Sequence, residues 1–252
     1  MNTDKKSFNL SRRSAIKYGG GFIGTGLAAT ILGGQLNNSQ SVDAQSIVET
    51  FESLVAQNKD ITPDEAFKRL MDGNDRFMNE KRISPNQTRE RIIEVSESQA
   101  PFAALLSCAD SRVPSEIIFD QGLGDLFVCR IAGNIATSEE IGSLEFGTMV
   151  LGAKVLMVMG HARCGAVKSA IEGGRFPGRI GSLISSLRVG VERAQRMPGT
   201  NKLQNAVEAN VLYQVEVLKE SPIVGELIDK NLLKVVGAYY DLSTGKVNIL
   251  SA

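Results

Sequence analysis

Three side chains that commonly bind transition metals stand in two short motifs. Cys108 opens the run Cys-Ala-Asp-Ser-Arg, and His161, the only histidine of the chain, is followed three residues later by Cys164. Thiolate sulfur and imidazole nitrogen are ligands that zinc prefers. One turn of chain can direct His161 and Cys164 to a single ion, whereas Cys108 has to come from another segment. Three protein ligands leave a fourth position for water or substrate, which is typical of a catalytic zinc site.

Two charged residues, Asp110 and Arg112, belong to the same motif as Cys108. A carboxylate so close to a ligand can accept a hydrogen bond from hydroxide at the metal, and Arg112 can hold that carboxylate through a charge-assisted pair. If the arginine releases it, Asp110 can instead become a fourth ligand and close the site. An ordinary salt bridge is the alternative interpretation of the pair, and the residues alone leave these arrangements open.

The pattern of apolar runs predicts how these motifs are positioned. Short apolar runs at 102–106, 126–129, 155–159 and 235–240 alternate with helical patterns near 138–152, 164–173, 181–195 and 202–219. This alternation predicts an α/β fold with a mostly parallel central sheet flanked by helices. Residues 241–250, with Ser-Thr-Gly as the turn, predict a C-terminal hairpin strand. Cys108 and His161 each fall just past a predicted strand, where open parallel sheets bind ligands. Cys129 lies inside a run and is interpreted as a core residue.

An N-terminal helical arm is predicted over 45–81, within a single domain over 45–252. Residues 47–58 have helical spacing, and Thr62-Pro63-Asp64-Glu65 is a capping box that should begin a helix reaching about residue 81. These helices should pack on the domain or on a partner subunit. Residues 82–99 are polar and predict a connection that contains a short helix.

Residues 1–44 have the pattern of an export leader. An arginine pair, Arg12-Arg13, precedes an uncharged Gly- and Ala-rich run, and Val42-Asp43-Ala44 offers a cleavage site. The pair is typical of twin-arginine export to the periplasm, a route that carries folded proteins. Membrane contact is expected only through the leader, and a retained leader would leave the protein membrane-associated. A basic tail with a helical anchor is the alternative.

The charge balance argues against nucleic-acid binding. The chain of 252 residues has 28 basic and 28 acidic residues, and the leader holds five of the basic and two of the acidic ones. The remainder is therefore slightly acidic and has no basic excess to bind a polyanion.

The two metal-binding motifs, about fifty residues apart, resemble those of the β-class carbonic anhydrases, and the similarity extends over roughly 62–250, including 73–77 and 130–134. The resemblance implies reversible hydration of carbon dioxide to bicarbonate and a proton. It also implies one Zn²⁺ per subunit, held by Cys108, His161 and Cys164, with Asp110 and Arg112 as catalytic residues. A homodimer or a tetramer is implied, with the N-terminal helices embracing the neighbour.

The resemblance further implies a substrate pocket. Gln99, nine residues before Cys108, matches a glutamine that holds the substrate oxygen in plant-type members. Phe127 matches an apolar wall of that pocket. Gly165 is assigned to substrate binding with them. Phe146 departs from the pattern, because plant-type members have a tyrosine there whose hydroxyl can orient the glutamine. This difference concerns substrate positioning and not the class of reaction.

Two rival functions are compatible with the motifs. A related enzyme on the same centre would hydrolyse carbonyl sulfide or carbon disulfide, and a zinc-bearing binding or assembly protein would lack turnover. The second kind of protein would usually have lost a ligand, Asp110 or Arg112, and all of these are present.

Overall fold

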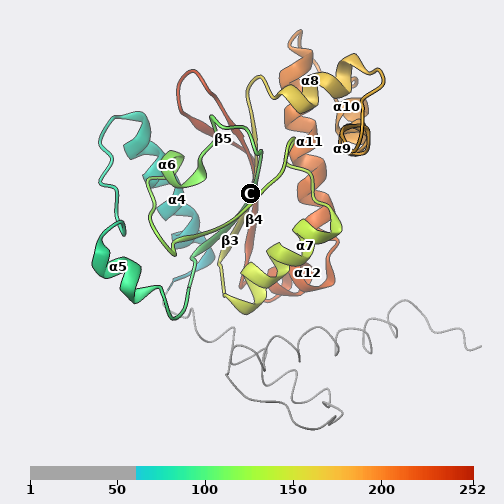
Figure 1. Ribbon diagram of the computed structural model, residues 1–252. Helices are drawn as coiled ribbons and strands as arrows, with labels where there is room; N and C mark the ends of the chain where they lie inside the picture. The colour runs from blue at the N-terminus through green and yellow to red at the C-terminus, as the bar shows by residue number, and fades with distance from the viewer. Residues whose placement is uncertain (1–60) are drawn as a thin grey trace, which may run out of the picture. The chain divides into compact units, whose positions relative to one another are not determined.

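The computed structural model describes residues 61–252, which form a five-stranded sheet covered by helices (Figure 1). The strand order is β2-β1-β3-β4-β5. The strands are β1 (Ala103–Ser107), β2 (Leu126–Arg130), β3 (Val155–His161), β4 (Lys234–Tyr240) and β5 (Val247–Ser251). The first four are parallel to their neighbours, and β5 runs antiparallel to β4. The predicted α/β fold and its C-terminal hairpin strand are thus confirmed, whereas the leader over 1–44 and the helix over 47–58 lie outside the described residues.

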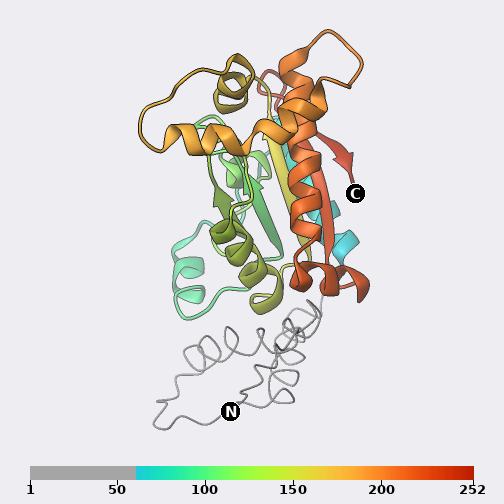
Figure 2. The ribbon, with the colours of Figure 1, turned by 90° about the vertical axis from the view of Figure 1, so that its right-hand side faces the viewer.

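Helices cover both faces of the sheet (Figures 1 and 2). They are α4 (Pro63–Met78), α5 (Arg89–Glu94), α6 (Ser115–Ile118), α7 (Ser138–Glu145), a π-helical turn η2 (Phe146–Val150), α8 (Gly165–Glu172), α9 (Ile180–Ser186), α10 (Arg188–Ala194), α11 (Lys202–Lys219) and α12 (Pro222–Asp229). On one face α4 and α6 bury the side chains of Leu105, Met157 and Val236. On the other face α11 packs against β3 and β4. Within residues 61–252 no helix is both long and apolar enough to cross a membrane.

Helix α4 begins where the capping box predicts. The hydroxyl of Thr62 accepts from the backbone N–H of Glu65 at 3.2 Å, and the carboxylate of Glu65 accepts from the backbone N–H of Thr62 at 2.8 Å. Pro63 occupies the first helical turn, where its missing N–H costs nothing. The helix ends at Met78, shortly before the predicted end near residue 81.

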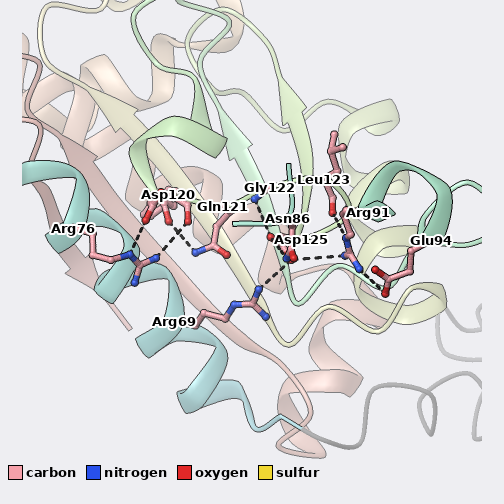
Figure 3. A network of polar contacts seen from close by, with 11 residues as sticks. Arg69, Arg76, Asn86, Arg91, Glu94, Asp120, Gln121, Gly122, Leu123 and Asp125 are labelled. Atoms are coloured by element: carbon pink, nitrogen blue, oxygen red, sulfur yellow. Dashed lines mark hydrogen bonds and ion pairs between the residues drawn. The ribbon is translucent and has the colours of Figure 1, made fainter. Parts of the chain in front are cut away.

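Two buried carboxylates fasten the segment after α4 to the sheet (Figure 3). Asp120 accepts from Nε of Arg76 at 2.6 Å and from the backbone N–H groups of Ile83 and Ser84 at 3.1 and 2.9 Å. Asp125 similarly contacts Arg69, Asn86, Arg91 and the backbone N–H of Gly122. The polar connection over 82–99 is therefore held in place mainly by hydrogen bonds to these two carboxylates, together with the ion pair of Arg91.

Three local expectations need correction. The helix predicted over 181–195 is two helices, α9 and α10, divided at Leu187. Helix α12 was not predicted, although Ser221 as N-cap and Pro222 behind it are a recognisable start signal. Cys129 is half-buried rather than in the core, because β2 is the outermost strand of the sheet and only part of each side chain is covered there.

Candidate metal centre

The fold brings the three predicted ligands together at one edge of the sheet. Cys108 directly follows β1, His161 is the last residue of the adjacent strand β3, and Cys164 is the N-cap of α8. Their ligand atoms all lie within 4.8 Å of one another, and the two sulfur atoms are 4.0 Å apart. All three residues are buried. Residues from three elements therefore form one compact donor set of two sulfurs and one nitrogen.

Hydrogen bonding fixes the tautomer of His161. Its Nδ1 lies 2.9 Å from the carbonyl oxygen of Ala162, so Nδ1 carries the proton and donates it to that oxygen. The other ring nitrogen, Nε2, is buried and has no hydrogen-bond partner. A neutral imidazole with a lone pair left unpaired in the interior is costly unless a ligand takes it. The donor set therefore fits a zinc ion, whose histidine ligands typically hold the second nitrogen in this way.

The environment of Cys108 favours its thiolate form. Hydrogen bonding from Cys164 is the largest influence and, with help from the backbone N–H of Gly133, lowers the pKa of Cys108 to about 4 against the opposing effect of burial. Donation to Cys108 and burial together raise the pKa of Cys164. The surroundings of Cys108 thus favour the thiolate, which is the form of cysteine that binds metals.

Asp110 and Arg112 form a two-point ion pair beside the ligands. Arg112 donates from Nε and Nη2 to the two carboxylate oxygens at 2.8 and 2.7 Å, and its backbone N–H donates at 3.0 Å. These bonds hold the pKa of Asp110 well below its usual range. Oδ2 of the same carboxylate lies 3.7 Å from Nε2 of His161. An ionised carboxylate therefore faces the centre while the arginine holds it.

Sequence reasoning gave no role to Arg130 at the end of β2. Its Nε donates to the carbonyl oxygen of Cys108 at 3.0 Å, and its Nη2 donates to that of Asp110 at 2.6 Å. The guanidinium thus fixes the backbone of the loop that carries both residues. The available signal was that a predicted parallel strand ends at Arg130, at the same edge of the sheet as Cys108.

The predicted substrate residues divide between the two ends of the sheet. Gly165 directly follows Cys164 and is exposed, and a Cβ added there would meet no atom within 4 Å. Phe127 instead pairs with Ala104, four residues before Cys108 and therefore about 13 Å away along the strand. Gln99 is exposed and comes before β1 begins. A single chain therefore brings Gly165 to the ligands and does not bring Phe127 or Gln99.

Phe127 has the predicted neighbour at its own end of the sheet. Its ring lies 6.3 Å from that of Phe146, centroid to centroid, with the planes tilted by 46°. The two rings form an apolar surface between β2 and the π-helical turn η2. No hydroxyl is available on Phe146 to orient an amide, as the sequence already indicated.

Comparison with known proteins gives a consistent picture. The family described as carbonic anhydrase matches residues 103–247. A carbonic anhydrase 2 of Mycobacterium tuberculosis is 35% identical over 189 residues, covering 73% of this chain and 91% of that protein. The β-carbonic anhydrase of Coccomyxa, solved with acetazolamide, is 32% identical with a TM-score of 0.58 and covers 63% of this chain and 75% of its own. Tetrameric β-carbonic anhydrases of Sordaria macrospora share the fold, with a TM-score of 0.61 at 24% identity over 74% of this chain and 97% of theirs.

Proposed function

This chain belongs to the β-class carbonic anhydrases, and we propose that its buried cysteine–histidine–cysteine centre holds zinc for the reversible hydration of carbon dioxide to bicarbonate and a proton. The observation that carries the metal assignment is the unpaired Nε2 of His161 beside two cysteine sulfurs. When bound, zinc supplies the Lewis acidity that generates hydroxide from water near neutral pH.

The residues around the centre have separable tasks in this reaction. With zinc bound, the carboxylate of Asp110 would accept a hydrogen bond from water or hydroxide at the centre and so would direct an oxygen lone pair toward carbon dioxide. Arg112 keeps that carboxylate ionised and in place. The N-terminal end of α8 at Gly165 presents a partial positive charge, which favours bicarbonate.

The ion pair favours the open arrangement of the centre. Both carboxylate oxygens of Asp110 accept from Arg112, so moving Asp110 onto the metal would require breaking a two-point charge-assisted contact. We therefore propose that the fourth position is left to water and substrate when this pair is intact.

A homodimer is proposed as the smallest active unit. Gln99 and Phe127 lie away from the ligands of their own chain, so they can contribute to a pocket only at the centre of a second copy. Of the exposed large apolar residues in 61–252, five lie within one stretch of 41 positions: Ile83, Ile92, Ile93, Ile117 and Leu123. Backbone contacts join their segments, since Leu123 N–H donates to Asn86 O at 2.9 Å. Such an apolar surface is typical of subunit contacts.

Export through the twin-arginine route is also proposed, on the strength of residues 1–44. The ligands come from β1, β3 and α8, so the centre exists only after folding, and a route for folded proteins would allow the metal to be loaded before export. Fractionation of cells producing the full chain tests this proposal. Substitution of Arg12 and Arg13 by lysine should retain the protein in the cytoplasm.

The reaction itself is tested by stopped-flow hydration of carbon dioxide with zinc-loaded protein comprising residues 45–252, from about pH 6.5 to 9. Because two thiolates offset the formal charge of Zn²⁺, turnover should rise toward pH 8–9. A rate already constant from about pH 6.5 would contradict the expectation that two thiolate ligands weaken the Lewis acidity of the zinc. Absence of turnover in fully loaded protein would reject the proposed reaction and direct the assay to carbonyl sulfide and carbon disulfide.

A further inference from the structure

Two buried amide side chains interrupt the apolar face of α11. The helix packs against β3 and β4 with alanine, valine and leucine, yet Asn210 and Gln214 are only 1% and 3% exposed. A buried amide is costly unless its donors and acceptors are paired. The hydrogen-bond partners of these two amides therefore show which groups the amides position.

Hydrogen bonds connect these two amides, by way of the backbone of Gly133, to Cys108, one of the proposed metal ligands. Gln214 accepts from the backbone N–H of Ala136 at 2.9 Å and donates to Oδ1 of Asn210 at 3.1 Å. Nδ2 of Asn210 donates to the carbonyl oxygen of Gly133 at 2.9 Å. The backbone N–H of Gly133 then donates to Sγ of Cys108 at 3.3 Å.

The N–H and the carbonyl of Gly133 belong to two successive peptide groups joined at its Cα, so the backbone angles of this residue set their relative direction. Gly133 has φ of 79°, in the left-handed region that glycine adopts without strain. A Cβ there would lie 2.9 Å from Leu187, so the loop is also packed closely from its other side. The orientation of this N–H is therefore set by α11 and by packing, not by the loop alone.

Asn210 is itself held rigidly. A Cβ added to Gly190 in α10 would lie 2.7 Å from Cβ of Asn210 and 2.8 Å from its Cα, so the two helices approach closely at this point. Gln214 fixes the amide orientation by donating to Oδ1, which leaves Nδ2 directed at Gly133. A buried, rigid donor of this kind fixes its acceptor to within a few tenths of an ångström.

We propose that Asn210, oriented by Gln214, is a positioning residue for Cys108, because it holds the carbonyl of Gly133 and thereby helps to fix the residue whose N–H is directed at the Cys108 sulfur. The inference rests on the proposed metal centre. An N–H donor withdraws electron density from a thiolate, so this bond moderates the charge that Cys108 gives to a bound metal. It also fixes where the sulfur lies before the metal arrives, which lowers the cost of forming the site.

The test uses the full chain loaded with Co²⁺, whose thiolate-to-metal charge-transfer absorption reports the electron density on sulfur. Asn210→Leu removes the hydrogen-bond donor to Gly133 at similar side-chain volume. Gln214→Met keeps Asn210 but removes the hydrogen bond that orients its amide. Asn74→Leu is the matched control. Asn74 is an equally buried asparagine, but it contacts Ile118, Gly245 and Val247 instead of the centre. Zn²⁺ affinity of the metal-free proteins is measured in parallel by competition with a chelator.

Asn210→Leu should move the charge-transfer band to lower energy and weaken Zn²⁺ binding by about tenfold or more. Gln214→Met should give smaller changes in the same directions, and Asn74→Leu neither. An unmoved band, or an equal shift in Asn74→Leu, would overturn the inference. If Asn210→Leu does not fold, Gln214→Met decides by the same criteria. A native protein without any such band would instead refute the metal centre itself, so the two failures are distinguishable.

Discussion

At the scale of single residues, the proposed catalytic pair Asp110 and Arg112 is held in one arrangement. Arg112 is half-exposed and lies outside hydrogen-bond range of the ligand atoms, so its contribution is to hold a carboxylate that faces them. Asp110 is mostly covered, with 17% of its side chain exposed, and one oxygen lies near Nε2 of His161. The hydrogen bonds of the arginine therefore reach the ligands only by way of this carboxylate.

Asp110→Asn and Arg112→Ala should both retain zinc and lose most turnover. A roughly 10²- to 10³-fold loss in kcat is expected, because the oriented acceptor beside the reacting oxygen is removed or released. Stopped-flow assays together with zinc determination check this prediction. Glu116→Gln, an exposed carboxylate in α6, serves as the control and should leave kcat unchanged. Full activity in either variant of the pair would remove it from the mechanism.

At the scale of elements, close contact between α4 and the segment after α6 holds one side of the sheet. Gly73 lies in the interior of α4, and a Cβ there would come within 1.8 Å of the carbonyl oxygen of Phe119. Gly142 in α7 faces open space. The packing therefore requires glycine at position 73 and does not require it at position 142.

Opposite effects are expected from the same substitution at these two positions. Gly73→Ala should destabilise the protein by about 2 kcal/mol or more, because backbone must move to admit the methyl group. Gly142→Ala should stabilise it by about 0.5–1 kcal/mol through helix propensity. Chemical denaturation measures both free energies of unfolding. Equal effects would show that α4 does not approach Phe119 as closely as described.

Acid should release the segment that Asp120 fastens to α4. Burial alone raises the pKa of Asp120, but the hydrogen bonds from Arg76 and from the N–H groups of Ile83 and Ser84 outweigh it and lower the pKa. A lowered native pKa means that the carboxylate stabilises the fold above its unfolded pKa of about 3.9, and that this stabilisation disappears as pH falls through the native value.

Asp120→Asn should therefore reduce the free energy of unfolding by about 2–3 kcal/mol at pH 7. The difference from the native protein should shrink as the pH falls below about 4, because Asp120 of the unfolded chain then takes up a proton, and it should vanish once the pH also falls below the lowered native pKa. Urea titrations from pH 7 down to 3 measure it. Asp72→Asn removes an exposed pair with Lys68 and should cost less than about 1 kcal/mol. A difference independent of pH would mean that charge is not what Asp120 contributes.

At the scale of the whole molecule, one chain brings together the three predicted ligands but not all of the predicted substrate residues. The carboxyl ends of β1 and β3 carry the ligands, while Gln99 and Phe127 lie toward the opposite end of the sheet. Exposed apolar side chains occur on α5 and in the loop that leads into β2, the strand that carries Phe127. A second copy of the chain that packs on these side chains would receive Gln99 and Phe127 of the first copy beside its own metal ligands.

Replacing both Ile92 and Ile93 by aspartate should dissociate the proposed dimer and lower kcat/KM, with zinc content unchanged. The two side chains are 55% and 65% exposed in the single chain, so their loss should not disturb its folding. Sedimentation velocity and stopped-flow assays measure association and activity. Ile180→Asp, at a site 50% exposed on α9, is the control. A fully active monomer would refute the need for a second chain.

Much of the centre was determined by sequence alone, because metal ligation requires particular residue types at short spacing. His161 and Cys164 had to share a turn, and the apolar run ending at Cys108 predicted a strand that ends beside them. The parallel sheet followed from apolar runs alternating with helical patterns. The α9–α10 division and helix α12 were missed or misjudged because they depend on how short helices pack.

Only the tertiary structure decided which groups surround the ligands. Arg130 at the end of β2 and Gly133 in the loop after it contact Cys108, and Asn210 of α11 contacts Gly133. No local pattern encodes contacts over these separations. Gln99 and Phe127 matched a pocket by their spacing, yet the strand direction carries them away from the ligands of their own chain. Local sequence specifies side-chain chemistry and element type, whereas strand order and helix packing decide which distant groups meet.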